Sequence, residues 1–162
     1  MSSPFSSRVI IDLNAYGKNY GAVRARIPRE CGIAAVIKAD AYGHGAVPIA
    51  RKAIAEGVRM VAVASVSEAI ELREAGFTTP ILLLVQPEPG ALAAAIEADL
   101  RLLISDLETA ERLGDLARRA NKVVPIHCKI DTGMGRQGFA AETAVKDILS
   151  VTRISHVDIE GI

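Results

Sequence analysis

The sequence predicts an α/β fold with a parallel β-sheet, formed by one domain over residues 1–162. Short runs of Val, Ile, Leu and Ala recur along the chain, and each is followed by a segment with helical spacing of apolar residues. No stretch of linker composition interrupts this alternation. Strands that alternate with helices pair in parallel through right-handed crossovers. Two closures satisfy this pattern: an open doubly wound sheet, or part of an eight-stranded barrel.

The elements are expected in a regular order along the chain. The predicted strands cover residues 8–13, 33–38, 60–64, 81–85, 101–104, 123–130 and 154–162. The predicted helices cover residues 14–27, 46–56, 66–75, 90–98, 107–120 and 142–149. Asn14 is expected to cap the first helix. Ser65 with Glu68, and Ser105 with Glu108, have the spacing of a capping box and predict two further helix starts.

Composition limits both the core and the class of ligand. Half of the residues are hydrophobic and only 4% are aromatic, so the core must be built from aliphatic side chains. Nineteen basic residues balance nineteen acidic ones. This balance argues against binding to nucleic acid or to an anionic membrane, and favours a small neutral or zwitterionic ligand.

The chain carries no sign of export or of a structural metal. Residues 1–8 lack the apolar core of a signal peptide, and the longest strongly apolar run, 80–85, is too short to span a bilayer. We therefore expect a cytoplasmic protein. Cys31 and Cys128 are isolated and are interpreted as reduced thiols or core residues. The three histidines, His44, His127 and His156, lie at no zinc-binding spacing, so no metal is expected.

The stretch 33–45 runs from an apolar segment into a lysine and then into a loop with two glycines. Its first five residues are small or β-branched, as in a parallel strand covered on both faces, and Lys38 follows at the carboxyl end. Gly43 and Gly45 allow a sharp turn or close approach to a ligand. An amine beside low-dielectric walls is easier to deprotonate and can attack carbonyls. Lys38 is a candidate nucleophile; the alternative is a lysine that extends into solvent.

A second polar stretch covers residues 126–139. His127, Lys129 and Asp131 share one face of the predicted strand, because side chains alternate with period two. If this face looks into a barrel, each unpaired polar group would cost about 1–3 kcal/mol. The alternatives are a solvated edge strand, or an internal salt bridge between Lys129 and Asp131.

The same stretch contains the glycine pattern of a dinucleotide-binding loop. Gly133, Gly135 and Gly138 match the spacing, and Asp158 lies twenty residues further on. Against this interpretation, polar residues separate the first glycine from the apolar strand, and Asp158 falls in the middle of a predicted strand. A glycine pattern alone is a weak signal.

Both polar stretches resemble the alanine racemase family. Residues 35–45, Ala-Val-Ile-Lys-Ala-Asp-Ala-Tyr-Gly-His-Gly, are similar to the lysine motif of these pyridoxal-phosphate (PLP) enzymes, and residues 127–139 are similar to a second motif. Residues 12–15, 61–65, 68–76 and 159–162 resemble further landmarks of the family in the same order. The resemblance therefore covers nearly the whole chain.

The resemblance implies a role for four residues. Lys38 would bind PLP covalently and act as one of two acid–base groups at the α-carbon of the amino acid, and Tyr42 would contact the cofactor phosphate. Arg136 would lie beside the cofactor ring oxygen and the substrate carboxylate, as suits a planar cationic fork. Lys129 matches a position that is carbamylated in many members, where the resulting anion orients the arginine.

The resemblance also implies what the chain lacks. Members pair a (β/α)8 TIM-barrel domain with a second, mostly β domain and work as homodimers, and a barrel of this type takes about 250 residues. We therefore expect residues 1–162 to be a truncated N-terminal barrel domain, with about six of eight strands and without the C-terminal β domain. Such a fragment of a longer enzyme would be inactive alone, because the opposite-face tyrosine and most of the phosphate site would be missing.

The implied reaction is the interconversion of L-alanine and D-alanine, which supplies D-alanine for peptidoglycan. Three alternatives remain at this point. The first is a racemase of the same family acting on another amino acid such as serine. The second is a non-catalytic PLP-binding barrel protein, and the third is a nucleotide-binding open sheet.

Overall fold

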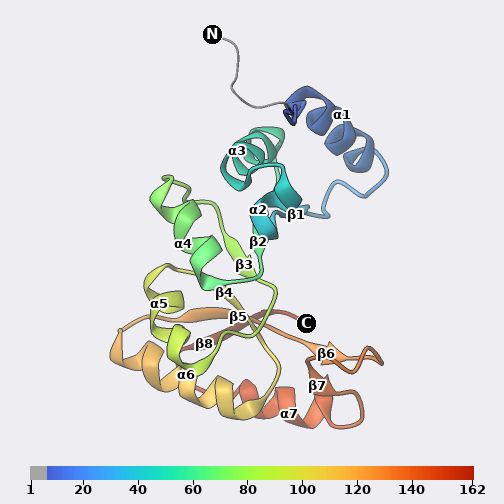
Figure 1. The fold of residues 1–162 in the computed structure, drawn as a ribbon. Coiled ribbons are helices and arrows are strands. Elements are labelled where there is room, and N and C mark those ends of the chain that lie inside the picture. Colours follow the sequence, from blue (N-terminus) through green and yellow to red (C-terminus); the bar gives the residue numbers. More distant parts are fainter. Residues whose placement is uncertain (1–6) are drawn as a thin grey trace.

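The computed structural model describes residues 7–162 and contains a six-stranded parallel sheet with helices packed against it (Figure 1). The sheet consists of β1 Ala34–Val36, β2 Met60–Val63, β3 Ile81–Leu83, β4 Arg101–Ile104, β5 Val124–Cys128 and β8 Val157–Gly161. A separate two-stranded ladder pairs β6 Ile130–Asp131 with β7 Phe139–Ala140. The helices are α1 Leu13–Arg24, α2 Lys38–Gly43, α3 Ala46–Glu56, α4 Val66–Glu74, the short 3₁₀ helix η1 Pro89–Ala91, α5 Leu92–Glu97, α6 Leu107–Arg119 and α7 Ala144–Val151.

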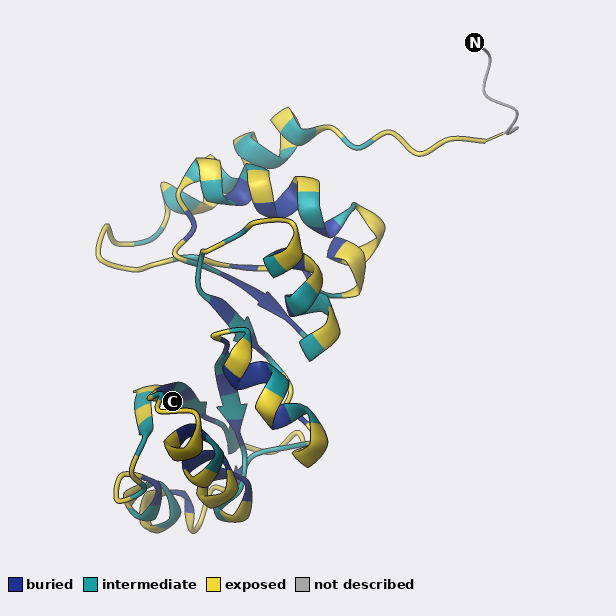
Figure 2. Ribbon diagram, turned by 90° about the vertical axis from the view of Figure 1, so that its left-hand side faces the viewer, coloured by how far each residue is buried: buried dark blue, intermediate teal, exposed yellow. Residues whose placement is uncertain are grey.

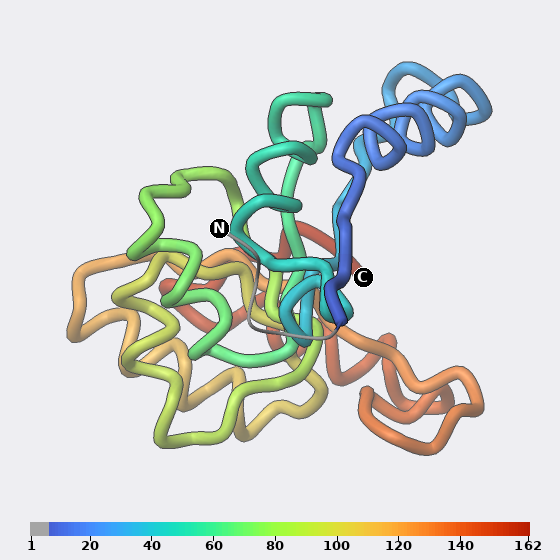
Figure 3. Tube along the Cα trace, turned by 45° about the horizontal axis from the view of Figure 1, so that its top comes forward, coloured from blue at the N-terminus to red at the C-terminus, as the bar shows by residue number. Residues whose placement is uncertain are grey.

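The strand order decides between the two predicted closures. In the sheet the order is β1-β2-β3-β4-β5-β8, so each strand pairs with the next member of this sheet along the chain, and all pairs are parallel. A doubly wound sheet would reverse its strand order at a switch point. The described residues contain no such reversal, so the open doubly wound alternative is wrong and the incomplete barrel is confirmed. Figure 3 follows this order along the trace, with α1 and the β6–β7 segment projecting from the sheet.

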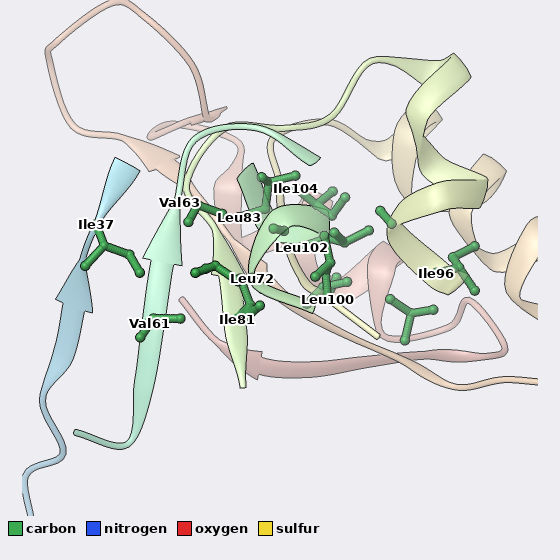
Figure 4. Packing of buried hydrophobic residues seen from close by; sticks show 14 of the residues in the cluster. Ile37, Val61, Val63, Leu72, Ile81, Leu83, Ile96, Leu100, Leu102 and Ile104 are labelled. Atoms are coloured by element: carbon green, nitrogen blue, oxygen red, sulfur yellow. The ribbon is translucent and has the colours of Figure 1, made fainter. Parts of the chain in front are cut away.

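An aliphatic core lies between the sheet and its helices, as the composition predicts. Buried residues concentrate in the strands and on the helix faces that meet them (Figure 2). Figure 4 shows Val61, Ile81, Leu83 and Leu102 from the strands packing beside Leu72 of α4. Burying side chains of this size contributes about 1.5–3 kcal/mol each. This core fixes the strands whose carboxyl ends carry the candidate site.

The predicted strand at residues 8–13 is wrong. No described strand pairs with this segment, and the side chains of Val9 and Ile10 are 84% and 74% exposed. A run of β-branched residues becomes a strand only where another strand meets it. The cap of α1 is also not Asn14. Asp12 takes this place and accepts hydrogen bonds from the backbone N–H groups of Asn14 and Ala15, at 2.8 and 3.1 Å.

One of the two predicted capping boxes forms. Ser65 Oγ accepts the Glu68 N–H at 3.3 Å and the Glu68 carboxylate accepts the Ser65 N–H at 3.2 Å, so the first box is confirmed. At the second, Asp106 is the cap and accepts the Thr109 N–H at 2.7 Å. The Ser105 N–H instead donates to Gln86, which lies after β3.

The remaining predicted elements are present with shifted ends. The largest difference is in the predicted strand 123–130, which divides after Cys128 into β5 and the separate strand β6. An element that the periodicity did not predict is α2, which follows β1 directly. None of the helices within residues 7–162 is both long and apolar enough to cross a bilayer. Residues 1–6, part of the opening segment in which no signal peptide is expected, lie outside the described residues.

Candidate active site

Three of the four predicted site residues line one cavity of about 460 Å³ at the carboxyl ends of the strands. Lys38 follows β1, Lys129 follows β5, and Arg136 lies in the loop between β6 and β7. Leu84, Val85, Leu103 and Gln137 complete the lining. Parallel strands of a barrel end on one face, and side chains at these ends converge there. The fold thus brings Lys38 into one cavity with Lys129 and Arg136, which lie far from it in the sequence.

The charge of this cavity is one-sided. No carboxylate lines it, and within the described residues Lys38, Lys129 and Arg136 make no ion pair. Cations that share a space without a counter-ion repel one another, and an anion bound among them would relieve this repulsion. The donor set therefore suits a ligand that carries phosphate or carboxylate groups.

Lys38 begins a left-handed turn. Ala39, Asp40, Ala41 and Tyr42 all have φ between 52° and 55°, although none of them is glycine. The left-handed helical conformation costs about 1–2 kcal/mol per residue for L-amino acids. Four such residues in succession persist only where the surrounding structure holds them. This turn sits directly beside the candidate nucleophile.

Hydrogen bonds hold the turn at both ends. At its start, the Ala41 N–H donates to the Ile37 carbonyl at 2.9 Å, and the Ala39 N–H donates to Glu68 Oε1 at 2.8 Å. At its end, Asp40 Oδ1 accepts the Ala46 N–H of α3 at 2.6 Å. The capping-box spacing predicted the contact of Glu68 at the start of α4, but it did not predict the contact of Glu68 with the turn.

Tyr42 lies on the turn but does not line the cavity. Its side chain is 60% exposed. The backbone places it four residues after Lys38 on the same turn.

The three polar residues of the second stretch separate in the structure. Lys129 lines the cavity, but Asp131 turns into the β6–β7 loop, where its Oδ1 accepts the N–H groups of Gly133 and Gly135 at 2.9 and 3.0 Å. These hydrogen bonds, Gly133 first and Gly135 next, hold the pKa of Asp131 below its ordinary value. The predicted shared face is therefore wrong for Asp131, because the strand breaks at Lys129. The alternative salt bridge between Lys129 and Asp131 does not form.

His127 stays on β5 and packs against the neighbouring strand. Its ring lies over Gly161 of β8, where an added Cβ would stand 2.6 Å from Nδ1. The other ring nitrogen, Nε2, is buried without a hydrogen-bond partner among the described residues. His127 is not among the residues lining the cavity.

The glycine pattern serves the chain's own backbone. A Cβ at Gly138 would stand 2.8 Å from the Ile130 carbonyl carbon and would also meet the Asp131 nitrogen. Strand β7 follows Gly138, whereas a dinucleotide fingerprint requires a helix there. The nucleotide-binding interpretation is therefore wrong.

Comparison with known proteins agrees with the fold and with the family resemblance. A family model described as the N-terminal domain of alanine racemase matches residues 11–162. The chain belongs to the alanine racemase family. Its relatives include an alanine racemase of Geobacter sulfurreducens, which is 42% identical over 152 residues, 94% of this chain and 40% of the relative. An alanine racemase of Syntrophobacter fumaroxidans is 38% identical over 96% of this chain and 42% of the relative.

Solved structures give the same result for the fold. The alanine racemase of Clostridium difficile superposes with a TM-score of 0.86 at 36% identity, over 89% of this chain and 38% of that one. A histidine racemase of Leuconostoc mesenteroides has a TM-score of 0.81 at 25% identity, over 90% of this chain and 39% of that one. The chain thus spans about two-fifths of the length of the relatives it matches.

Proposed function

We propose that this chain provides the lysine-bearing part of a PLP-dependent racemase that interconverts L-alanine and D-alanine. The observation that carries the proposal is the cavity lined by Lys38, Lys129 and Arg136 at the strand ends of an alanine racemase-family barrel. The relatives named alanine racemase support alanine as the substrate. D-alanine for peptidoglycan would be the use of the product.

The residues of the cavity fit PLP. An aldehyde needs a nearby amine, which Lys38 offers, and an anionic phosphate needs cations or hydrogen-bond donors, which the one-sided charge and the exposed Tyr42 offer. When bound, PLP supplies an electron sink that makes the α-carbon proton of an amino acid acidic.

The chain's own groups would then divide the remaining work. Lys38 Nζ takes the proton from one face of the α-carbon or returns it there. Arg136 binds the substrate carboxylate through its planar fork. The opposite face requires a second acid–base group from outside this chain, which we assign to a tyrosine of a partner subunit in a homodimer.

Carbamylation of Lys129 would complete the charge arrangement. Lys129 and Arg136 line the same cavity, and neither forms an ion pair among the described residues. A carbamate on Lys129 would replace the repulsion between two cations in this cavity by an attraction that orients the arginine. Intact-mass measurement of the chain in bicarbonate buffer tests this directly, with a mass increase lost in Lys129→Ala.

The domain organisation belongs to the same proposal. Residues 1–162 would form the N-terminal part of the PLP-binding barrel, and the rest of the barrel and a C-terminal β domain would complete the enzyme. The chain covers 40% and 42% of two relatives, which supports this division. We therefore expect no racemisation by residues 1–162 alone.

Covalent labelling tests the central assignment. The full-length protein is incubated with PLP, reduced with borohydride and mapped by peptide mass spectrometry. We expect the label on Lys38, its loss in Lys38→Ala, and its retention in Lys146→Ala, a control at an exposed lysine of α7. A label at other lysines, with Lys38 unmodified, would contradict the proposal.

A second experiment addresses the substrate. In the full-length protein, exchange of the α-hydrogen for deuterium is measured with alanine, serine and histidine. Exchange with alanine supports the proposal, while labelling of Lys38 without exchange would indicate a non-catalytic PLP-binding protein. The histidine racemase with the same fold makes another amino acid the second candidate, favoured if exchange is faster with histidine or serine.

Arg136→Lys refines the test. We expect turnover to fall while PLP labelling of Lys38 persists, because a lysine cannot form two parallel hydrogen bonds to a carboxylate. Unchanged kinetics would remove Arg136 from the site.

A further inference from the structure

The two peptide groups on either side of the Lys38 Cα are each held by a hydrogen bond. In the peptide before it, the Ile37 carbonyl accepts the Ala41 N–H at 2.9 Å. In the peptide after it, the Ala39 N–H donates to Glu68 Oε1 at 2.8 Å. The planes of two flanking peptides determine where the Cα–Cβ bond points. These two hydrogen bonds therefore set the direction in which the Lys38 side chain leaves the backbone.

Of the two hydrogen-bond partners, Ala41 belongs to the turn itself, whereas Glu68 comes from a distant part of the chain. It lies on α4, twenty-nine residues after Ala39. Its second oxygen, Oε2, accepts the N–H groups of Ala64 and Ser65 at 2.7 and 3.2 Å, so one carboxylate joins the end of β1 to the end of β2. Both strands enter the core, and their pairing in parallel register keeps these ends together.

We propose that Glu68 is a positioning residue for Lys38: by holding the Ala39 amide it aims the Lys38 amine into the cavity that contains Arg136. This inference rests on the function proposed for Lys38. It gives Glu68 a role beyond the capping box, since a helix cap needs only the oxygen that faces Ala64 and Ser65. The oxygen that faces Ala39 stabilises a turn whose backbone conformation is unfavourable for every residue in it.

The chain offers variants that separate the two roles. Glu68→Gln keeps the size of the side chain but has one acceptor oxygen in place of two. An oxygen that keeps the two N–H groups of Ala64 and Ser65 leaves the single Ala39 N–H without an acceptor. Ser65→Ala removes the Ser65 Oγ contact of the same capping box and leaves the Glu68–Ala39 hydrogen bond in place. Glu71→Gln is the matched control on an exposed position of α4.

The first measurement is amide hydrogen exchange of the chain without cofactor. We expect the Ala39 amide to exchange at least about tenfold faster in Glu68→Gln, which corresponds to about 1.4 kcal/mol of local opening. In Ser65→Ala and Glu71→Gln the Ala39 rate should change by less than about threefold. Rates are taken relative to the amide of Leu72, a buried residue of α4, so that a general loss of stability in Glu68→Gln does not count.

The second measurement is borohydride-trapped PLP on Lys38 in full-length protein that carries the same substitutions, at equal PLP concentration. We expect Glu68→Gln to reduce the labelled fraction several-fold, with Ser65→Ala and Glu71→Gln close to the unsubstituted chain. Unchanged Ala39 exchange in Glu68→Gln, or an equal reduction of labelling in Ser65→Ala, would overturn the positioning role. Absence of Lys38 labelling in the unsubstituted full-length protein would contradict the proposed function instead, and the Ala39 exchange rate would still decide whether Glu68 holds the turn.

Discussion

Replacement of Gly138 by alanine tests the link between the β6–β7 ladder and the loop that carries Arg136. The Gly138 φ of 144° is unfavourable for a residue with a side chain. In addition, the new Cβ would stand 2.8 Å from the Ile130 carbonyl carbon and 3.1 Å from the Asp131 Cα. These are backbone atoms of β6, so a side-chain rotation cannot relieve the contact.

Gly133→Ala is the matched control for this substitution. Gly133 has a φ of 130°, but a Cβ there would meet no described atom within 4 Å. The backbone strain, about 1–3 kcal/mol, is therefore common to both variants. Overpacking against backbone adds about 1–3 kcal/mol for Gly138→Ala alone. That surplus corresponds to about a 5–150-fold difference in the equilibrium for opening the ladder.

Hydrogen exchange at the Phe139 amide measures this difference. Its N–H donates to the Lys129 carbonyl at 2.8 Å, and this hydrogen bond breaks when β7 leaves β6. We expect exchange to be about 5–150-fold faster in Gly138→Ala than in Gly133→Ala, with weaker binding of carboxylate ligands in the former. Equal acceleration in the two variants would refute the steric argument.

Three further predictions concern stability, measured by urea unfolding. Gly114→Ala should lower the free energy of unfolding by about 1–3 kcal/mol, because the new Cβ would stand 2.5 Å from Ile154 Cγ2 and 3.0 Å from the Ser155 carbonyl oxygen. Its control is Gly21→Ala in α1, where the space is open, and this substitution should raise the free energy of unfolding by up to about 1 kcal/mol. Arg73→Met should cost about 2–4 kcal/mol, because the Arg73 guanidinium donates to the carbonyls of Ala98, Asp99, Phe77 and Thr79 at 2.8–3.2 Å. Burial raises the pKa of Asp106, but hydrogen bonds from Gln86 and Thr109 outweigh it and leave this pKa below its ordinary value. Asp106 therefore adds its full contribution to the free energy of unfolding above the unfolded pKa of about 4, and this contribution is lost as the pH falls through the lower folded pKa. Between these two pKa values the free energy of unfolding should therefore fall less steeply with pH in Asp106→Asn than in the unsubstituted chain.

Local patterns in the sequence predicted the elements that depend on local chemistry. The buried strands and the Ser65–Glu68 box follow from apolar runs and from a spacing within one turn. The second capping box failed although its spacing is the same, because Asp106 is a competing cap and Gln86 takes the Ser105 N–H from nineteen residues away. Spacing within a segment carries no information about such a distant partner.

The left-handed turn after Lys38 lies beyond local prediction for the same reason. Alanine has no intrinsic preference for this conformation, yet Ala39 and Ala41 adopt it. The contact with Glu68 and the cap that Asp40 provides to Ala46 come from neighbouring elements. In the site, Lys38 could be singled out from its place at a strand end, whereas Arg136 and Tyr42 were indicated only by the family resemblance.

The ion pair between Arg101 and Glu160 occupies a carboxylate of the sheet with a partner that does not line the cavity. Arg101 is on β4 and Glu160 on β8, and both flank β5, yet their side chains meet at 2.6 and 3.1 Å across it. Strands two apart lie about 9–10 Å from each other, so such side chains meet readily where a curved sheet brings them together. A carboxylate on the sheet is thus already neutralised by an arginine within the sheet. Lys129 and Arg136 lie beyond the strand ends and have no carboxylate partner among the described residues. Their charges are therefore free to bind an anionic ligand.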